Sequence, residues 1–476
     1  MKVWLPRFLP TSILFILVSS VSVAHATDNS SATSIPKDET QTQESTSHAM
    51  SKEELHAYLK QNPQELEKLL TQMIQKQNAD ALAELLPIYS EYAMRDESMI
   101  EWGNAIIAMS KGDIQQSIKL YRKVNAVLPN IKLLRFQLAQ ALFQDKQYKA
   151  AKNELEKLRS SYTAQADIDQ INQFIQAIDH QNSWNFNVNA YFINDNNLTN
   201  ASPKGTSYNG LVNNQSHQEG KGIGYGLSAD KKWSLDDRFF TSAKFNLYGK
   251  NYWDNKKFNE ANANVGAGIG YQNATSEIEL YPSFTQGWYG GGTSGDGDLE
   301  KYSKNSALNL SVSHWFDPKL LYQNFSQYGK IRYEEPFDSN DINTRIFSNT
   351  LVYLPKQTRS FYAGLDLING DNSKGYDYNS YDKKGVRLGW SEAWNHGIST
   401  RVNLGFGKKD FDGQQFLTNI ERKDKEYDLG LSIWKRDFTI FKLTPRLSWN
   451  YHKVTSNSPF DEYSKNNVNF ELTQTF

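Results

Sequence analysis

The stretch Trp184–Phe192 reads WNFNVNAYF and alternates between apolar and polar side chains. Trp184, Phe186 and Val188 fall on one face, and three asparagines fall on the other. A period of two indicates a β-strand whose two faces meet different environments. The same alternation returns along the chain to its last residues, 466–476, which read NNVNFELTQTF. These runs predict a sheet with one apolar face and one polar face.

The composition favours a membrane protein over a water-soluble β protein. Aromatic residues make up 13% of the chain, yet the mean hydropathy is only −0.66. A transmembrane β-barrel combines these properties, because only alternate residues face lipid and aromatic side chains gather at the two membrane interfaces. A soluble many-stranded protein is the alternative, but it would need a further layer of structure to bury its apolar faces.

The predicted connections between strands alternate in length. Tight connections such as 273–275 and 435–437 are interspersed with long polar ones such as 194–220 and 288–299. Short turns at one mouth and long loops at the other are typical of bacterial outer-membrane barrels. From residue 184 onward we count about fourteen runs, an even number as such barrels require. The predicted fold class is α + transmembrane β, with a helical domain followed by a 14-stranded antiparallel outer-membrane β-barrel over 184–476.

The polar faces of the predicted strands carry charged side chains, which suit a water-filled barrel interior. We predict that six of these charges face the lumen: Lys244, Glu277, Glu279, Arg387, Arg401 and Arg446. Both signs are present, so no single charge dominates the predicted lumen.

The last run is predicted to close the barrel by pairing with the first strand near Trp184. A free terminal edge strand would be an aggregation hazard, whereas closure removes the edge. Phe470, Leu472 and Phe476 lie in phase on this run. An aromatic terminal residue after alternating apolar positions resembles the signal by which bacterial outer-membrane proteins are handed to the barrel-assembly machinery. We therefore expect that machinery as a partner.

The other end of the chain indicates export from the cytoplasm. Residues 1–26 read MKVWLPRFLPTSILFILVSSVSVAHA, with basic residues, a short apolar run and an A-x-A site. This pattern predicts a secretory signal peptide, and the alternative of a membrane anchor is weaker because the apolar run is short. Residues 27–50 are rich in Ser, Thr and Gln and are predicted to form a disordered tether. The chain has no cysteine, so disulfides and thiolate metal sites are excluded.

Residues 51–180 are predicted to form helices in a repeat of about 34 residues. Under this offset Ala105 matches Ala139, and Ser117 matches Ala151. Small residues are needed where two helices cross closely, and a degenerate earlier unit spans about 64–97. The pattern resembles the tetratricopeptide repeat, ending in a capping helix. An unrelated helical bundle is the alternative.

In a tetratricopeptide repeat one helix of each pair lines a concave groove. The groove positions carried over to this chain are Trp102, Ile106, Met109, Phe136, Gln140 and Phe143. Trp102 and Phe136 occupy equivalent positions, so an aromatic stripe along the groove is one interpretation. Such a groove suits an extended peptide or a disordered segment. Ordinary packing against the capping helix is the other interpretation.

The order of signal peptide, short repeat domain and fourteen-stranded barrel resembles the surface lipoprotein assembly modulator (Slam) family. The segment YFINDNNLTNAS, with Asp195, Asn197 and Asn200, is similar to that family's link between the first strand and its loop. The resemblance implies an outer-membrane translocon with a periplasmic helical domain and a lipid-embedded barrel. Its cargo would be surface lipoproteins or related secreted haem-binding proteins. The resemblance also implies that the groove of the periplasmic repeats would contact this cargo or a periplasmic chaperone.

Two alternative functions remain from the residues. Exopolysaccharide-secretion porins also join such repeats to a barrel, but they carry longer repeat arrays and a lumen of one dominant charge. An outer-membrane enzyme would need a catalytic set, and His314, His396 and His452 lie in or beside separate predicted strands. We find no serine elbow or H-E-x-x-H motif, and we predict no catalytic activity, metal or cofactor. The net charge of −1 argues against a nucleic-acid partner.

Overall fold

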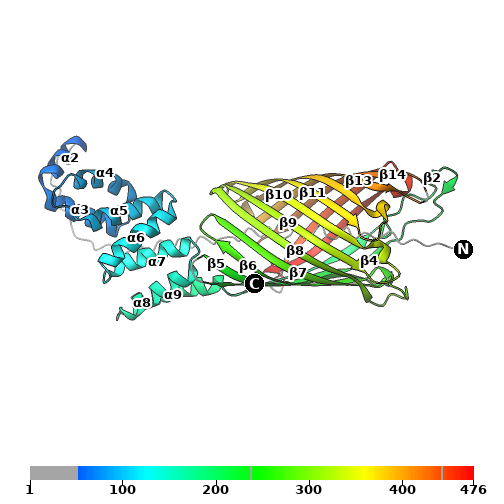
Figure 1. Cartoon of the computed structure of the whole chain (residues 1–476), viewed down its shortest axis with the longest axis horizontal. Helices are drawn as coiled ribbons and strands as arrows, with labels where there is room; N and C mark the ends of the chain where they lie inside the picture. Colours follow the sequence, from blue (N-terminus) through cyan, green and yellow to red (C-terminus); the bar gives the residue numbers. More distant parts are fainter. Residues whose placement is uncertain (1–51, 236–237, 417, 441–442, 476) are drawn as a thin grey trace.

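The computed structural model describes residues 52–235, 238–416, 418–440 and 443–475 (Figure 1). The predicted signal peptide and tether, and Phe476, lie outside these residues. The described N-terminal part is helical, with α2 (Lys52–Gln61), α3 (Pro63–Gln75), α4 (Ala79–Ser90), α5 (Glu97–Ser110), α6 (Ile114–Val127), α7 (Lys132–Gln144), α8 (Tyr148–Ser160) and α9 (Gln165–Gln181). None of these helices is long and apolar enough to cross a membrane.

The predicted tetratricopeptide-like repeat is confirmed by the positions of its small residues. Ala105 and Ala139 are fully buried, and the Ser117 hydroxyl donates to the Ala105 carbonyl at 2.8 Å. These small side chains let the two helices of each pair, α5 with α6 and α7 with α8, approach closely, and the larger Tyr121 and Leu155 are buried in the second helix of each pair. The pair α3 and α4 supplies the predicted earlier unit.

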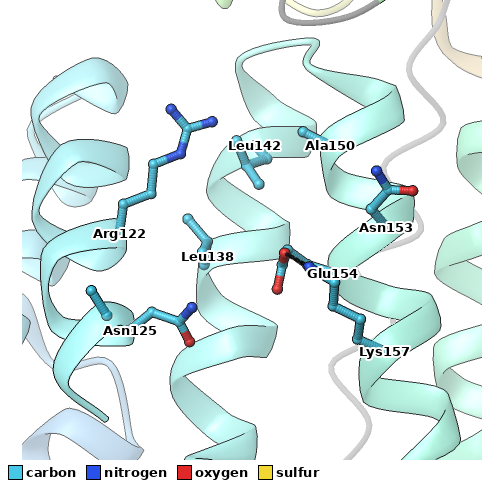
Figure 2. A pocket seen from close by; sticks show the side chains of 9 residues that line it. Arg122, Asn125, Leu138, Leu142, Ala150, Asn153, Glu154 and Lys157 are labelled. Atoms are coloured by element: carbon cyan, nitrogen blue, oxygen red, sulfur yellow. Dashed lines mark hydrogen bonds and ion pairs between the residues drawn. The ribbon is translucent and has the colours of Figure 1, made fainter. Parts of the chain in front are cut away.

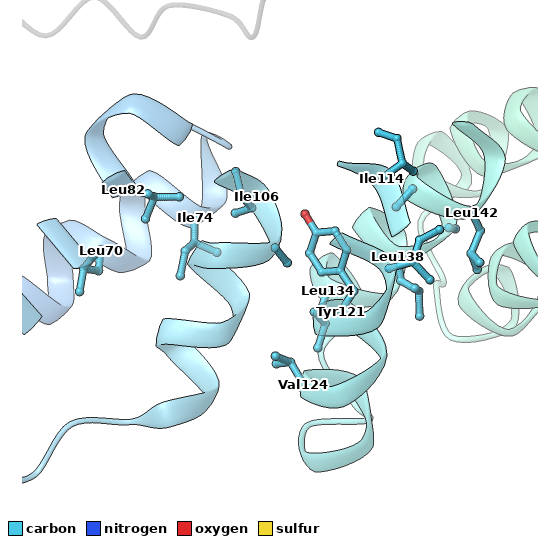
Figure 3. Close-up of a cluster of buried hydrophobic side chains, with 14 of the residues drawn as sticks. Leu70, Ile74, Leu82, Ile106, Ile114, Tyr121, Val124, Leu134, Leu138 and Leu142 are labelled. Carbon is cyan, nitrogen blue, oxygen red and sulfur yellow. The ribbon is translucent and has the colours of Figure 1, made fainter. Parts of the chain in front are cut away.

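A single apolar core runs through the helical domain. Figure 3 shows side chains from successive helices pointing into it, including Leu70, Leu82, Tyr121 and Leu142. In α9 the buried residues are Ile171, Ile175 and Ile178, which fall on one face of the helix. The predicted capping helix is therefore present and buries its apolar face against the array.

The C-terminal part forms a closed antiparallel barrel, as predicted. Its fourteen strands are β1 (Trp184–Asp195), β4 (Gly220–Ser234), β5 (Phe239–Tyr252), β6 (Glu260–Gln272), β7 (Ser276–Tyr289), β8 (Glu300–Asp317), β9 (Leu320–Tyr333), β10 (Ile342–Lys356), β11 (Arg359–Asn372), β12 (Tyr381–Ala393), β13 (Ile398–Gln414), β14 (Glu421–Lys435), β15 (Thr444–Ser456) and β16 (Tyr463–Thr475). Each strand pairs with its neighbour in sequence, and β16 pairs with β1.

The two faces of the barrel wall reverse the arrangement of a water-soluble protein. In β1 the apolar residues Phe186 and Val188 are 41% and 38% exposed, while Asn187 and Asn189 are half-buried. An exposed band of apolar side chains around a closed barrel is the surface that lipid covers. The polar residues of each strand point into the barrel instead.

The connections alternate in length as predicted, with one exception. Most connections at the end nearest the helical domain, here called the domain-side rim, have two to four residues. The connection from β14 to β15 spans residues 436–443, so the length predicted for it, 435–437, is wrong. A turn does lie at the predicted place, where the Phe438 N–H donates to the Lys435 carbonyl at 3.3 Å. There Ile440 and Leu443 form a small bridge that supports a longer connection. At the opposite end, the far rim, the β1–β4 loop carries the hairpin β2 (Ser207–Tyr208) and β3 (Leu211–Val212), which projects outward (Figure 1).

Candidate functional site

The predicted aromatic stripe of the helical domain is partly engaged in packing. The Trp102 indole Nε1 donates to the Gln137 Oε1 at 2.6 Å and so joins α5 to α7. Phe136 meets Phe174 of the capping helix edge-to-face, with ring centroids 5.2 Å apart. Trp102 and Phe136 remain half-buried, so each keeps part of its surface open.

The other predicted groove residues occupy different environments. Ile106 is only 3% exposed and belongs to the core, so its side chain faces other helices of the domain. Met109, Gln140 and Phe143 are half-buried. Phe143 lies against Tyr148 at the start of α8, with ring centroids 5.6 Å apart.

A pocket of about 270 Å³ lies on the α6–α8 side of the domain and contains none of the six predicted groove residues. Figure 2 shows Leu138 and Leu142 of α7 between polar side chains of α6 and α8. The Arg122 guanidinium donates to the side-chain oxygen of Gln147 at 3.2 Å. The Arg135 guanidinium donates to the Glu154 carboxylate at 3.3 Å. Sequence reasoning missed this pocket because its polar lining resembles the ordinary solvent face of an amphipathic helix.

Near the domain-side rim, three of the predicted lumen charges form ion pairs between strands that are not adjacent in the barrel. Lys244 Nζ lies 2.8 Å from Glu279 Oε2, and the Glu279 side chain is almost fully buried. Glu277 pairs with Lys232 of β4. The Lys244–Glu279 pair joins β5 to β7 across β6, and the Lys232–Glu277 pair joins β4 to β7 across β5 and β6.

Arg387 makes the most complete set of contacts among the predicted lumen residues. Its guanidinium donates to both carboxylate oxygens of Asp366, at 2.6 and 2.9 Å, and to the Ser348 hydroxyl at 2.9 Å. A bidentate arginine–carboxylate pair of this kind fixes both side chains. It links β10, β11 and β12 inside the wall.

Arg401 and Arg446 share an aromatic neighbour. The guanidinium carbons of Arg446 and Arg401 lie 4.4 and 5.8 Å from the ring centroid of Trp434. Arg446 also lies 3.8 Å from Glu471. The six predicted lumen residues therefore combine both charge signs, and every one of them except Arg401 lies within 4 Å of an oppositely charged group.

The seam between the first and last strands joins Asn187–Tyr191 of β1 to Glu471–Thr475 of β16. Phe470 is exposed on the outer face, and Leu472 is half-buried. Beyond Tyr191 the far-rim side of the seam is bridged by Lys465, whose Nζ lies 3.1 Å from Asp195.

The asparagine-rich segment after β1 folds as a tight, buried turn. The Asp195 carboxylate accepts from the Asn197 N–H at 2.9 Å, and the Asn197 side chain bonds both backbone groups of Ala201. Asn200 has a φ of +49°, a left-handed conformation that asparagine tolerates better than most residues. This turn therefore positions the carboxylate that meets β16.

Comparison with known proteins identifies a matching family and several similar proteins. Residues 184–476 match the family described as "Surface lipoprotein assembly modifier", and residues 52–155 match that family's N-terminal tetratricopeptide repeats. "Surface lipoprotein assembly modifier 1" of Haemophilus influenzae is 39% identical over 84% of this chain and 82% of the relative. "Surface lipoprotein assembly modifier" of Pasteurella multocida is 34% identical over 82% and 79%. "Hemophilin secretion modulator" of Acinetobacter baumannii is 22% identical over 88% and 87%.

Proposed function

Because this chain belongs to the surface lipoprotein assembly modifier family, we propose that it moves surface lipoproteins, or related secreted haem-binding proteins, across the outer membrane. The observation that carries this function is that one chain joins the family's repeat domain to the short-turn rim of its closed barrel. The helical domain lies in the periplasm and receives the cargo. The barrel supplies the route or the folding surface toward the cell exterior.

The half-buried aromatics Trp102, Phe136 and Phe143 contact the cargo, or a chaperone that accompanies it. This assignment is supported by the partly exposed surface of each of these side chains. They lie on the helices that line the concave side of a tetratricopeptide array. Extended segments bind such grooves through a few aromatic anchors. We assign no catalytic step to the protein.

Assembly of the barrel requires the barrel-assembly machinery. The signal for that partner is the terminal strand, with Phe470, Leu472 and Phe476 in phase. Phe470 points toward lipid, in keeping with a strand that is recognised before the barrel closes.

An exopolysaccharide porin is the less favoured function. Export of a charged polymer calls for a lumen with one dominant sign of unpaired charge. In this barrel, Lys244 instead pairs with Glu279 and Arg387 pairs with Asp366, so the charges within each pair neutralise each other.

Surface display tests the proposal. The chain is expressed together with the lipoprotein encoded beside its gene, and intact cells are probed with protease or antibody. We expect display only when this chain is present, and we expect a variant lacking residues 51–180 to lose it. If the lipoprotein stays in the periplasm while polysaccharide release rises, the cargo class is wrong.

A further inference from the structure

The turns inside the repeats share a left-handed residue. Gln77, Gly112 and Lys146 have φ values of +51°, +79° and +59°, and they lie 35 and 34 residues apart. Each residue follows the first helix of its pair by two positions. Glycine adopts this conformation without strain, whereas a lysine side chain is disfavoured there. The turns at Gln77 and Lys146 therefore both hold a residue with a side chain in a conformation that favours glycine.

The α7–α8 turn also lacks the helix cap that the two earlier turns have. Asn78 accepts from the Ala81 N–H, and Asp113 accepts from the Gln116 N–H, each at 3.1 Å. The equivalent Gln147 makes no such cap for α8, and its amide donates to Asp145 at 2.7 Å. A missing cap and a strained residue in the same turn indicate that this turn serves a contact outside the helical domain.

Asp145 makes that contact with two turns of the barrel. Its side chain is only 1% exposed, and its Oδ2 accepts from the Arg238 Nε at 2.6 Å. Its Oδ1 lies 3.3 Å from the Ala274 N–H, which donates to it. Arg238 precedes β5 and Ala274 lies between β6 and β7, so one carboxylate joins two neighbouring turns of the domain-side rim.

Lys146 continues the contact along the rim. Its carbonyl accepts from the Gln272 side chain at 3.4 Å, and its Nζ lies 3.7 Å from Glu277. Burial lowers the pKa of Lys146, while the nearby Glu277 carboxylate opposes that change. A cavity of about 130 Å³ between the domain and the barrel has Lys146 and Glu277 in its lining. Lys146 and Glu277 are half-buried at this junction between the two parts of the chain.

A second anchor lies where the two parts are covalently joined. Asn182 Oδ1 accepts from both the N–H and the hydroxyl of Ser234, at 3.0 and 2.8 Å. The covalent link between α9 and β1 is residues 182–183 alone. This short link alone would allow the helical domain to rotate relative to the barrel. The separate attachment at Asp145 prevents that rotation.

We propose that the turn Asp145–Gln147 is a docking element that locks the helical domain onto the barrel rim and directs the α7 end of its groove toward the barrel mouth. Asp145 and Lys146 are then positioning residues for the transfer of cargo from the helical domain to the barrel. The role of this turn in cargo transfer rests on the proposed function. The docking itself rests only on the contacts described above.

Charge reversal tests the docking. Since the chain has no cysteine, Lys119→Cys and Lys319→Cys, two exposed positions on α6 and the domain-side rim, accept a pair of spin labels. We expect a narrow distance distribution in the full-length protein and a broad one after Asp145→Arg. The docking equilibrium should shift by roughly tenfold or more, because a buried charge-assisted bond is lost. The double variant Asp145→Arg with Arg238→Asp should restore the narrow distribution and surface display.

The matched control is Asp113→Arg, which removes a helix cap in the equivalent turn of the preceding repeat. It should leave the distance distribution narrow. A distribution that stays narrow in Asp145→Arg would refute the docking element. A broad distribution with normal display would refute its positioning role. If the unsubstituted protein displays no cargo, the proposed function fails, and the spin-label distances still decide the docking.

Discussion

Trp102 and Gln137 form a buried polar contact that joins two successive repeats. Gln137 is only 1% exposed, so its amide oxygen depends on the Trp102 N–H for a hydrogen-bond partner. Sequence patterns place both residues on helices, but they do not show that one satisfies the other. The stability of the helical domain therefore depends on this single hydrogen-bond donor, the Trp102 N–H.

Trp102→Phe should destabilise the helical domain by about 1–3 kcal/mol, because it leaves a buried amide oxygen unpaired. The measurement is the thermal loss of the helical circular dichroism signal of the full-length protein. The double variant Trp102→Phe with Gln137→Leu should regain most of the loss, since neither polar partner then remains. Equal stabilities for the single variant and the unchanged protein would contradict this role.

Arg387→Leu should lower the temperature at which the barrel unfolds, because it leaves the Asp366 carboxylate buried without its partner. Breaking a buried pair on one side costs about 3–5 kcal/mol. Samples are heated to a series of temperatures before electrophoresis, and the loss of the band of the folded barrel gives the unfolding temperature. Arg345→Leu is the matched control, since that arginine is exposed and should change little. A similar shift for both variants would show that the Asp366 pair is not the cause.

At the scale of elements, the period of two explains the strands and the period of 3.6 explains the helices. The sheet has alternating faces along β1, and α9 has one buried face at Ile171, Ile175 and Ile178. The connection 436–443 was mispredicted because turn chemistry at 435–437 is local, whereas strand ends are set by pairing with neighbours.

The closure of β16 on β1 predicts a specific cross-link. Ala190 and Leu472 are paired positions, so their Cα atoms lie within the range that a disulfide can bridge. Ala190→Cys with Leu472→Cys should therefore cross-link on oxidation in the membrane, which non-reducing gels detect. Ala190→Cys with Phe470→Cys is the control, two residues out of register. A stronger cross-link in the control would mean that the seam is shifted by two residues.

At the scale of the whole molecule, the barrel and the helical domain have separate means of stabilisation. The barrel closes through strand pairing, and the domain has its own apolar core. The rim contacts at Asp145 and Asn182 orient one part on the other without completing either fold.

A chain without residues 51–180 should therefore still fold its barrel. We expect it to keep the faster mobility of a folded barrel on unheated gels, with the signal peptide retained for export. The full-length protein is the control. If the shortened barrel does not fold, its loss of surface display cannot be assigned to the repeats.

Residue spacing along the chain is sufficient to predict the fold class, the repeat and the faces of most strands. These follow from local spacing: two residues for strands, and Ala105 against Ala139 for the repeat. It also predicted which charges, such as Lys244 and Glu279, lie on polar faces.

Which of these residues meet is visible only once the chain is folded. The pairing of Lys244 with Glu279, the contact of Phe136 with Phe174, and the contact of Asp145 with Arg238 join positions far apart in the chain. Local periodicity specifies the face on which a side chain lies. Its partner depends on strand register, helix crossing and the docking of two folded parts, and each of these is fixed by packing across the whole molecule.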